Sequence, residues 1–312
     1  MSPLKSGILY LLVIVSILAG SVVLAAYSYI WVGRPVDIVF SLIYSEVLML
    51  LPTLLFAMFA RVDINDAFGI HSVKRRTILF TIPYVLMIMP MVSAMNALSM
   101  LFTHNVITKM ENDVVAKPFL ESFFVLAIFG PFVEELVFRG VIFSGLRKSR
   151  RILAAIILQA FMFGFMHMNF NQFGYAVVVG IAFGLLREVT GSILPSFTGH
   201  MLINGWSTIL MYVMPASQSS DEAEMTKYEL LSSCVHLLII SFLALVAARY
   251  FLRKIAKSEE CGELRLYRIF HNKRKRIVDS EGNEKLEKRK WIVTVPAVLA
   301  MIISAVVSYK TL

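Results

Sequence analysis

The sequence predicts an all-α fold, a polytopic transmembrane helical bundle of about eight or nine spans, and three observations carry that prediction. Hydrophobic residues make up 58% of the 312-residue chain and charged residues only 16%, whereas soluble domains average about half and about a quarter. The mean hydropathy is +0.73. Apolar runs close to the roughly 20 residues that a membrane-crossing helix needs recur along the whole chain. This composition excludes a disordered chain and disfavours a soluble enzyme.

Nine segments are apolar and long enough, or nearly long enough, to cross a bilayer. The first follows Lys5 as in a signal peptide, but its apolar run is too long for one, so we expect an uncleaved helix. The sixth is short enough to be a tilted, broken or re-entrant piece. In order, the nine are 8–32, 36–60, 77–102, 118–146, 152–170, 173–186, 193–214, 230–250 and 291–309.

These spans divide the chain into five successive parts. The first three helices lie in 1–117, the four segments that carry unusual polar residues in 118–214, and an eighth helix in 215–252. A basic cytoplasmic segment follows at 253–290, and a last helix, expected to span, at 291–312.

The distribution of positive charge predicts the orientation of the helices. A net charge of +9 would suggest a nucleic-acid partner in a soluble protein, but membrane proteins concentrate Lys and Arg on their cytoplasmic side. With the N-terminus inside, 24 of the 30 basic residues fall on the inner side and 5 on the outer side. We therefore expect an integral protein of a membrane, best suited to a bacterial cell membrane, with a cytoplasmic N-terminus and no nucleic-acid partner. The inner segment 253–290 is expected to be a solvated connector, the alternative being a contact of Lys273–Arg276 with anionic lipid.

Ionisable side chains inside spans are costly and usually functional, so each needs a reason. For Glu46 and His236 we expect a satisfied interior hydrogen bond. The two cysteines, Cys234 and Cys261, match no metal or redox spacing. The remaining polar groups are concentrated in three segments, which carry Glu134, Glu135 and Arg139, then His167, then His200 and Asn204.

The two adjacent carboxylates of the fourth segment predict two different roles. Neighbouring residues of an α-helix point about 100° apart, so Glu134 and Glu135 are expected to serve different neighbours. Glu135 and Arg139 are four residues apart and can pair on one face. Glu134 has no such partner in its own helix, which makes it the candidate general base.

The histidines add further groups at a similar depth. His200 and Asn204 share a helix face and supply hydrogen-bond donors that can hold a water or an oxyanion, and Phe163 stands one turn before His167. At about 1.5 Å per residue, Glu134, His167 and His200 lie roughly 20, 24 and 20 Å from the inner loops. All three therefore fall in one layer near the middle of the membrane.

The pattern Glu134-Glu135-x-x-x-Arg139, Phe163-x-x-x-His167 and His200-x-x-x-Asn204 resembles the three motifs of the CPBP intramembrane proteases. These are the CAAX prenyl protease and bacteriocin-processing proteins, also called the Abi family, and the matching core is 118–214. The resemblance implies an intramembrane endopeptidase that cleaves a membrane-associated or prenylated peptide. It implies that Glu134 activates the water, assisted by His167. By the same resemblance, His200 and Asn204 hold the water or the oxyanion. Supporting roles fall to Glu135, Arg139 and Phe163.

Three alternatives to this interpretation remain open: one for the mechanism and two for the function. The resemblance favours a site without a cofactor, but Glu134, His167 and His200 could complete a three-ligand catalytic zinc site, although H-E-x-x-H is absent. Some members of the family are described as bacteriocin self-immunity or regulatory proteins, which makes a membrane scaffold with little or no proteolysis the second function. A transporter is a third, because intramembrane Glu and His also build proton relays.

Overall fold

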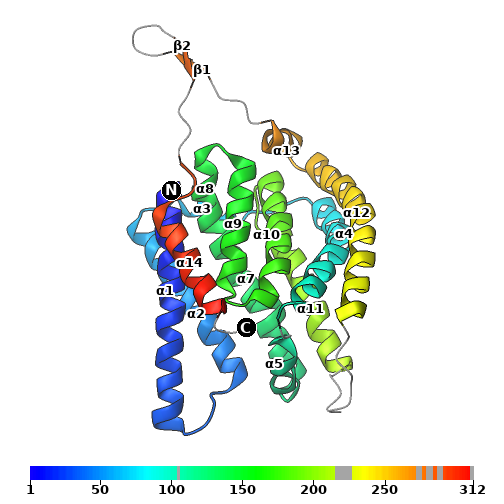
Figure 1. The fold of residues 1–312 in the computed structure, drawn as a ribbon. Coiled ribbons are helices and arrows are strands. Elements are labelled where there is room, and N and C mark those ends of the chain that lie inside the picture. Colours follow the sequence, from blue (N-terminus) through cyan, green and yellow to red (C-terminus); the bar gives the residue numbers. More distant parts are fainter. Residues whose placement is uncertain (104–105, 215–226, 272–275, 279–283, 287–290, 310–312) are drawn as a thin grey trace.

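The computed structural model describes residues 1–103, 106–214, 227–271, 276–278, 284–286 and 291–309. Its described part is a bundle of helices, as predicted (Figure 1). The strands in that part, β1 (Arg276–Val278) and β2 (Glu284–Leu286), form one antiparallel pair, which projects from one end of the bundle. The all-α prediction is therefore confirmed.

Five of the described helices are long and apolar enough to cross a membrane by length and composition. They are α1 (Pro3–Tyr27) with its continuation η1 (Ser28–Val32), α2 (Ile38–Phe59), α4 (Arg75–Met100), α10 (Phe170–Thr190) and α12 (Lys227–Ser258). Two shorter apolar helices, α9 (Ile152–Met166) and α14 (Val295–Tyr309), have 15 residues each. At about 1.5 Å per residue these two are roughly 22 Å long, less than the roughly 30 Å of a bilayer core.

Short helices occupy segments for which the sequence predicted no structure. These are α3 (Ile64–Phe68), α5 (Val106–Val115) and α13 (Gly262–Phe270). Asp63 starts α3 by accepting hydrogen bonds from the backbone N–H groups of Asn65 and Asp66. Helix α12 continues to Ser258, past the boundary expected at 252. Lys273 and the two residues after it lie outside the described residues, so the predicted lipid contact there stays a prediction.

The predicted fourth span is helical from Phe119 to Leu146 but changes its winding four times. It consists of α6 (Phe119–Phe123), the π-helix η2 (Phe124–Phe129), α7 (Gly130–Glu135), the π-helix η3 (Leu136–Ile142) and α8 (Phe143–Leu146), before the 3₁₀ turn η4 (Arg147–Ser149). Short π-helical stretches frequently accompany functional sites. Here two of them flank the pair Glu134–Glu135.

The expectation of a short or broken sixth segment is wrong. Helix α10 has 21 residues, starts at the cap Asn169 and ends at Gly191, whose φ of +79° suits glycine. Its polar ends concealed its length in the sequence, because Asn171, Arg187 and Glu188 are buried inside the protein. The seventh segment forms α11 (Leu194–Val213).

The basic segments of the sequence gather at one end of the bundle. Figure 1 shows the N-terminus, α3, α8, α13 and the β-hairpin at that end, whereas η1, α5 and the start of α12 lie at the opposite end. This arrangement matches the one that the charges predict, and which end faces the cytoplasm stays a prediction. Helices α4 and α12 pack along each other, as do α9 and α10 (Figure 1). The exposed row Val235, Ile239, Phe242 and Val246 on α12 suits contact with lipid.

Candidate active site

The carboxylates Glu134 and Glu135 end α7 in the interior of the bundle. Glu135 and Arg139 are fully buried, and Oε1 of Glu135 lies 2.9 Å from Nη1 of Arg139. The Arg139 guanidinium also lies over the ring of Phe163, 4.2 Å from its centroid, and 5.4 Å from that of Phe183. Ring faces attract a cation that has left water, so two aromatic rings and one carboxylate hold the buried charge.

His200 contacts both carboxylates. Its Nδ1 lies 3.0 Å from Oε1 of Glu135, and its Nε2 lies 3.5 Å from Oε2 of Glu134. The expectation that the two acids serve different neighbours is therefore wrong, because the two nitrogens of one imidazole reach both side chains from α11. The result is a continuous chain of charged or polar groups from Arg139 through Glu135 and His200 to Glu134. Glu134 stands at its accessible end, with 15% of its side chain exposed.

His167 lies at the end of α9 and contacts its own helix. Its Nδ1 lies 2.9 Å from the carbonyl oxygen of Phe163, so Nδ1 donates a proton there and the neutral ring keeps a bare Nε2. No ion-pair contact joins His167 to Glu134 in the described structure. The two histidines instead share Phe163, whose ring meets His167 edge-on at 5.0 Å and His200 at 6.0 Å.

Asn204 contacts the backbone of η2. Its amide nitrogen donates to the carbonyl oxygen of Leu126 at 3.0 Å. That carbonyl lacks its usual partners, because the N–H of Gly130 bonds to Val125 and Pro131 has no N–H. Asn204 thus satisfies an acceptor that the π-helix leaves open. Its expected role towards a water or an oxyanion stays a prediction for the second amide hydrogen.

Sequence reasoning missed Glu46 on α2 as a group of this site. Its Oε2 is buried and has no hydrogen-bond partner among the described residues, so the expected interior hydrogen bond is wrong for that oxygen. Glu46 interacts electrostatically with Glu134. The sequence does show an acidic residue in the middle of a predicted span, but no motif links Glu46 to residues 134 to 204.

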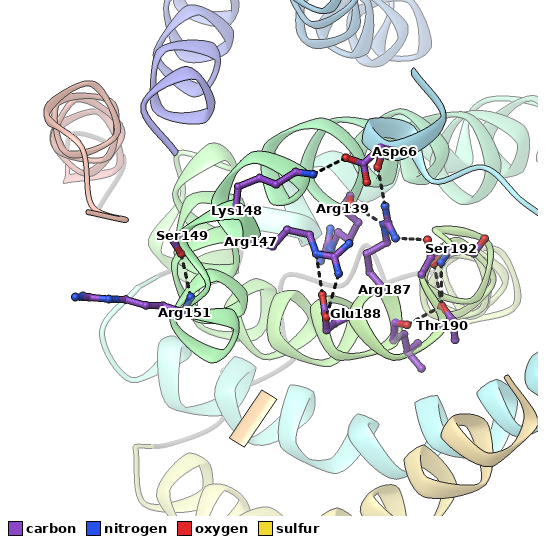
Figure 2. Close-up of polar contacts among 12 residues, drawn as sticks. Asp66, Arg139, Arg147, Lys148, Ser149, Arg151, Arg187, Glu188, Thr190 and Ser192 are labelled. Carbon is purple, nitrogen blue, oxygen red and sulfur yellow. Dashed lines mark hydrogen bonds and ion pairs between the residues drawn. The ribbon is translucent and has the colours of Figure 1, made fainter. Parts of the chain in front are cut away.

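A second polar cluster supports the site from the end where the basic segments gather (Figure 2). Arg187 is only 2% exposed and donates to backbone carbonyls of Arg139 at 3.1 Å and of Asp66 at 3.4 Å, as well as to that of Gly191. It thereby ties α3 and the start of α11 to the π-helix that carries Arg139. The Asp66 side chain binds Lys148 at 2.8 Å, which holds the pKa of that carboxyl below its usual range.

The residues named for a possible zinc site are not arranged as a ligand set. Among the described residues, no group of three or more His, Cys, Asp or Glu side chains is placed to hold a metal ion. Nδ1 of His200 faces Glu135, and His167 makes its ring-nitrogen contact with Phe163. The expectation of a site without a cofactor remains a prediction.

The fold and this site together define a class, a polytopic helical membrane protein with an acid–histidine cluster inside its bundle. Comparison with known families makes the assignment more specific. Residues 116–206 match the family described as type II CAAX prenyl endopeptidase, Rce1-like, so this part of the chain is similar to that family. All the motif residues from Glu134 to Asn204 fall in the matched range, so the resemblance found in the sequence is confirmed.

Two curated bacterial proteins are similar over the same part. The putative membrane peptidase YdiL of Bacillus subtilis (strain 168) is 27% identical over 86 residues, which cover 28% of this chain and 35% of that protein. The membrane-embedded CAAX protease MroQ of Staphylococcus aureus (strain USA300) is 32% identical over 108 residues, or 33% of this chain and 44% of that protein. The chain thus spans less than half the length of either relative. No solved structure matches it.

Proposed function

We propose that this protein is an intramembrane endopeptidase that hydrolyses a peptide bond of a membrane-associated or prenylated peptide, with a water activated by Glu134. The observation that carries the proposal is the division of labour between adjacent acids. Glu135 pairs with Arg139 and His200 in full burial, whereas the ion-pair contact of Glu134 in the described structure is with an imidazole nitrogen of His200 at 3.5 Å, and its side chain is partly accessible. The names of the two relatives, both membrane peptidases, support the same reaction.

In the proposed reaction, Glu134 first accepts a proton from water and later donates it to the nitrogen of the scissile bond. The ionised Glu134 takes a proton from water as the water oxygen attacks the carbonyl carbon of the scissile bond. The resulting oxyanion accepts hydrogen bonds, for which the imidazole of His200 and the amide of Asn204 are the proposed donors. Glu134 then returns the proton to the amide nitrogen, the C–N bond breaks, and an amine and a carboxylic acid leave, the acid then giving its proton to the amine or to solvent.

Three other residues act through His200 in this proposal. Glu135 accepts the Nδ1 proton of His200 and fixes the direction of its ring, so that Nε2, which carries a second proton in this proposal, points at Glu134 and can donate to the oxyanion. Arg139 keeps Glu135 ionised, and Phe163 packs against both the Arg139 guanidinium and the His200 ring. Such outer partners hold a catalytic side chain in its working geometry.

The test is cleavage of membrane-anchored peptides by the purified protein in lipid vesicles. Matched peptides with and without a prenyl group would be offered in ¹⁸O-labelled water. We expect one ¹⁸O atom in each newly formed carboxylate, no product with Glu134→Gln, and normal product with the control Glu121→Gln, since Glu121 is exposed in α6. We also expect activity to survive a chelator and the active protein to lack stoichiometric zinc. Zinc whose removal abolishes cleavage and whose return restores it would contradict the metal-free mechanism.

A further inference from the structure

The carboxyl group of Glu46, on helix α2, lies in the interior of the bundle beside the proposed site. In the part of the chain that the structure describes, one carboxylate oxygen of Glu46 is buried with no hydrogen-bond partner, and an ionised carboxylate in such a place is costly in free energy. Helix α2 packs against α7, the helix that carries Glu134. The Glu46 carboxyl is therefore a third acid of the region, beside Glu134 and Glu135, on a helix that the sequence motifs do not include.

The Glu46 carboxyl group lies beside Gly130 of α7. A methyl group added at Gly130 would lie 3.4 Å from Oε1 of Glu46 and 3.7 Å from its Cδ, and 3.2 Å from the carbonyl oxygen of Val125. Gly130 lies four residues before Glu134, so both positions belong to one face of α7. The Glu46 carboxyl thus rests on the same face from which Glu134 projects.

The charged groups around Glu46 leave Glu134 as its main electrostatic neighbour. The cation Arg139 of η3 is paired with Glu135 at 2.9 Å. His200 of α11 contacts Glu134 and Glu135. The nearby charge that acts on the Glu46 carboxyl is therefore that of Glu134. The other titratable residues on the elements packed against α2 are Lys5, Tyr10 and Tyr27 of α1 and Lys109, Glu111 and Asp113 of α5.

We propose that Glu46 is a positioning residue that shares one proton with Glu134: Glu46 holds the proton, and Glu134 remains the single ionised acid that faces His200 Nε2. Two neighbouring carboxyl groups cannot both ionise without strong repulsion. With a proton on each ring nitrogen, His200 donates from Nε2 to the ionised Glu134, whereas among the described residues the buried Oε2 of Glu46 has no donor beside it. The kinetic consequence rests on the peptidase function proposed above, and the sharing of the proton does not.

Infrared spectroscopy of the protein in lipid vesicles tests the shared proton without any activity. At neutral pH the wild type should show the C=O stretching band of a buried protonated carboxyl group. Glu46→Gln should lose that band and Glu121→Gln should keep it. In Glu134→Gln the band should persist to a different pH than in the wild type, because Glu46 no longer faces a second acid. A wild type without the band, or a folded Glu46→Gln variant that keeps it, would overturn the proposal.

The dependence of peptide cleavage on pH is the second measurement. In the wild type kcat/KM should fall at high pH as the pair loses its shared proton, and in Glu46→Gln that decline should be absent. A residue that only fills space would leave the shape of the profile unchanged, so superimposable profiles from folded proteins would overturn the proposal. If no variant cleaves any peptide, the peptidase function fails, while the infrared result still decides whether the proton is shared.

Discussion

His200 places one imidazole ring between two acids that are neighbours in the chain. Because its two nitrogens face Glu135 at 3.0 Å and Glu134 at 3.5 Å, the ring couples a fully buried ion pair to a partly accessible carboxylate. The same pair of acids therefore contains one residue that the fold needs and one that the proposed chemistry needs. Substitutions that change only the charge should separate these two roles.

Replacing each acid by its amide tests this separation. Glu135→Gln leaves the Arg139 guanidinium buried without its carboxylate, and breaking a buried pair in this way costs about 3–5 kcal/mol of stability. Glu134→Gln removes no ion-pair partner of Arg139, so its melting temperature in detergent should stay near that of the wild type while cleavage disappears. Equal destabilisation of the two variants would make Glu134 a structural residue and remove the case for a catalytic base.

At the scale of single residues, the sequence predicted the pairs that lie within one helix and missed those that join helices. The spacing of Glu135 and Arg139 is sufficient to predict their contact, because four residues make about one turn. The contact of His200 with both acids depends on how α11 crosses α7, and no spacing encodes that. The contacts of Asn204 with Leu126 and of Glu46 with the α7 face also require the assembled bundle.

At the scale of elements, the two π-helices show where hydropathy stops being informative. An apolar run predicts a helix from about 118 to 146, and one is present. The change of winding at Gly130 and Pro131 leaves the Leu126 carbonyl to Asn204, and hydropathy carries no trace of it. The same holds for α10, whose buried polar ends hid seven residues of helix from the apolar pattern.

The cluster in Figure 2 predicts unequal effects of two basic residues that both contact the Asp66 segment. Arg187 is buried and donates to carbonyls of three segments, so Arg187→Ala should cost roughly 1.5–3 kcal/mol, the range for hydrogen bonds from charged groups. Lys148 is half exposed and pairs with the Asp66 side chain, so Lys148→Ala should cost about 0–1 kcal/mol. Thermal melts in one detergent compare the two, and an equal or reversed order would contradict the role given to Arg187.

At the scale of the whole molecule, the grouping of basic segments at one end of the bundle is the main support for the predicted orientation. Composition and hydropathy predict the fold class well, because a bilayer demands long apolar helices whatever their packing. They do not predict which helices meet in the interior. The helices α9 and α14, about 22 Å long each, are shorter than the roughly 30 Å of a bilayer core, so an apolar run alone does not predict a full span.

Labelling of the native cysteines tests the orientation. Cys261 is exposed beside α13, whereas Cys234 is buried. A thiol reagent that cannot cross membranes should spare Cys261 in intact cells and modify it in inverted vesicles. The control is Arg34→Cys in a Cys261→Ser background, since Arg34 is exposed after η1 at the other end of the bundle, and it should show the opposite pattern. Labelling of Cys261 in intact cells would reverse the orientation of the whole bundle.

The central claim, that Glu134 drives hydrolysis within the membrane, is tested most directly by comparing peptide termini in membranes that contain equal amounts of the wild type or of Glu134→Gln. Mass spectrometry should find new termini, clustered in membrane-associated proteins or peptides, only where the wild type is present. A scaffold would act equally well with either side chain. The same set of termini in both membranes, with the two proteins equally abundant and folded, would contradict the claim.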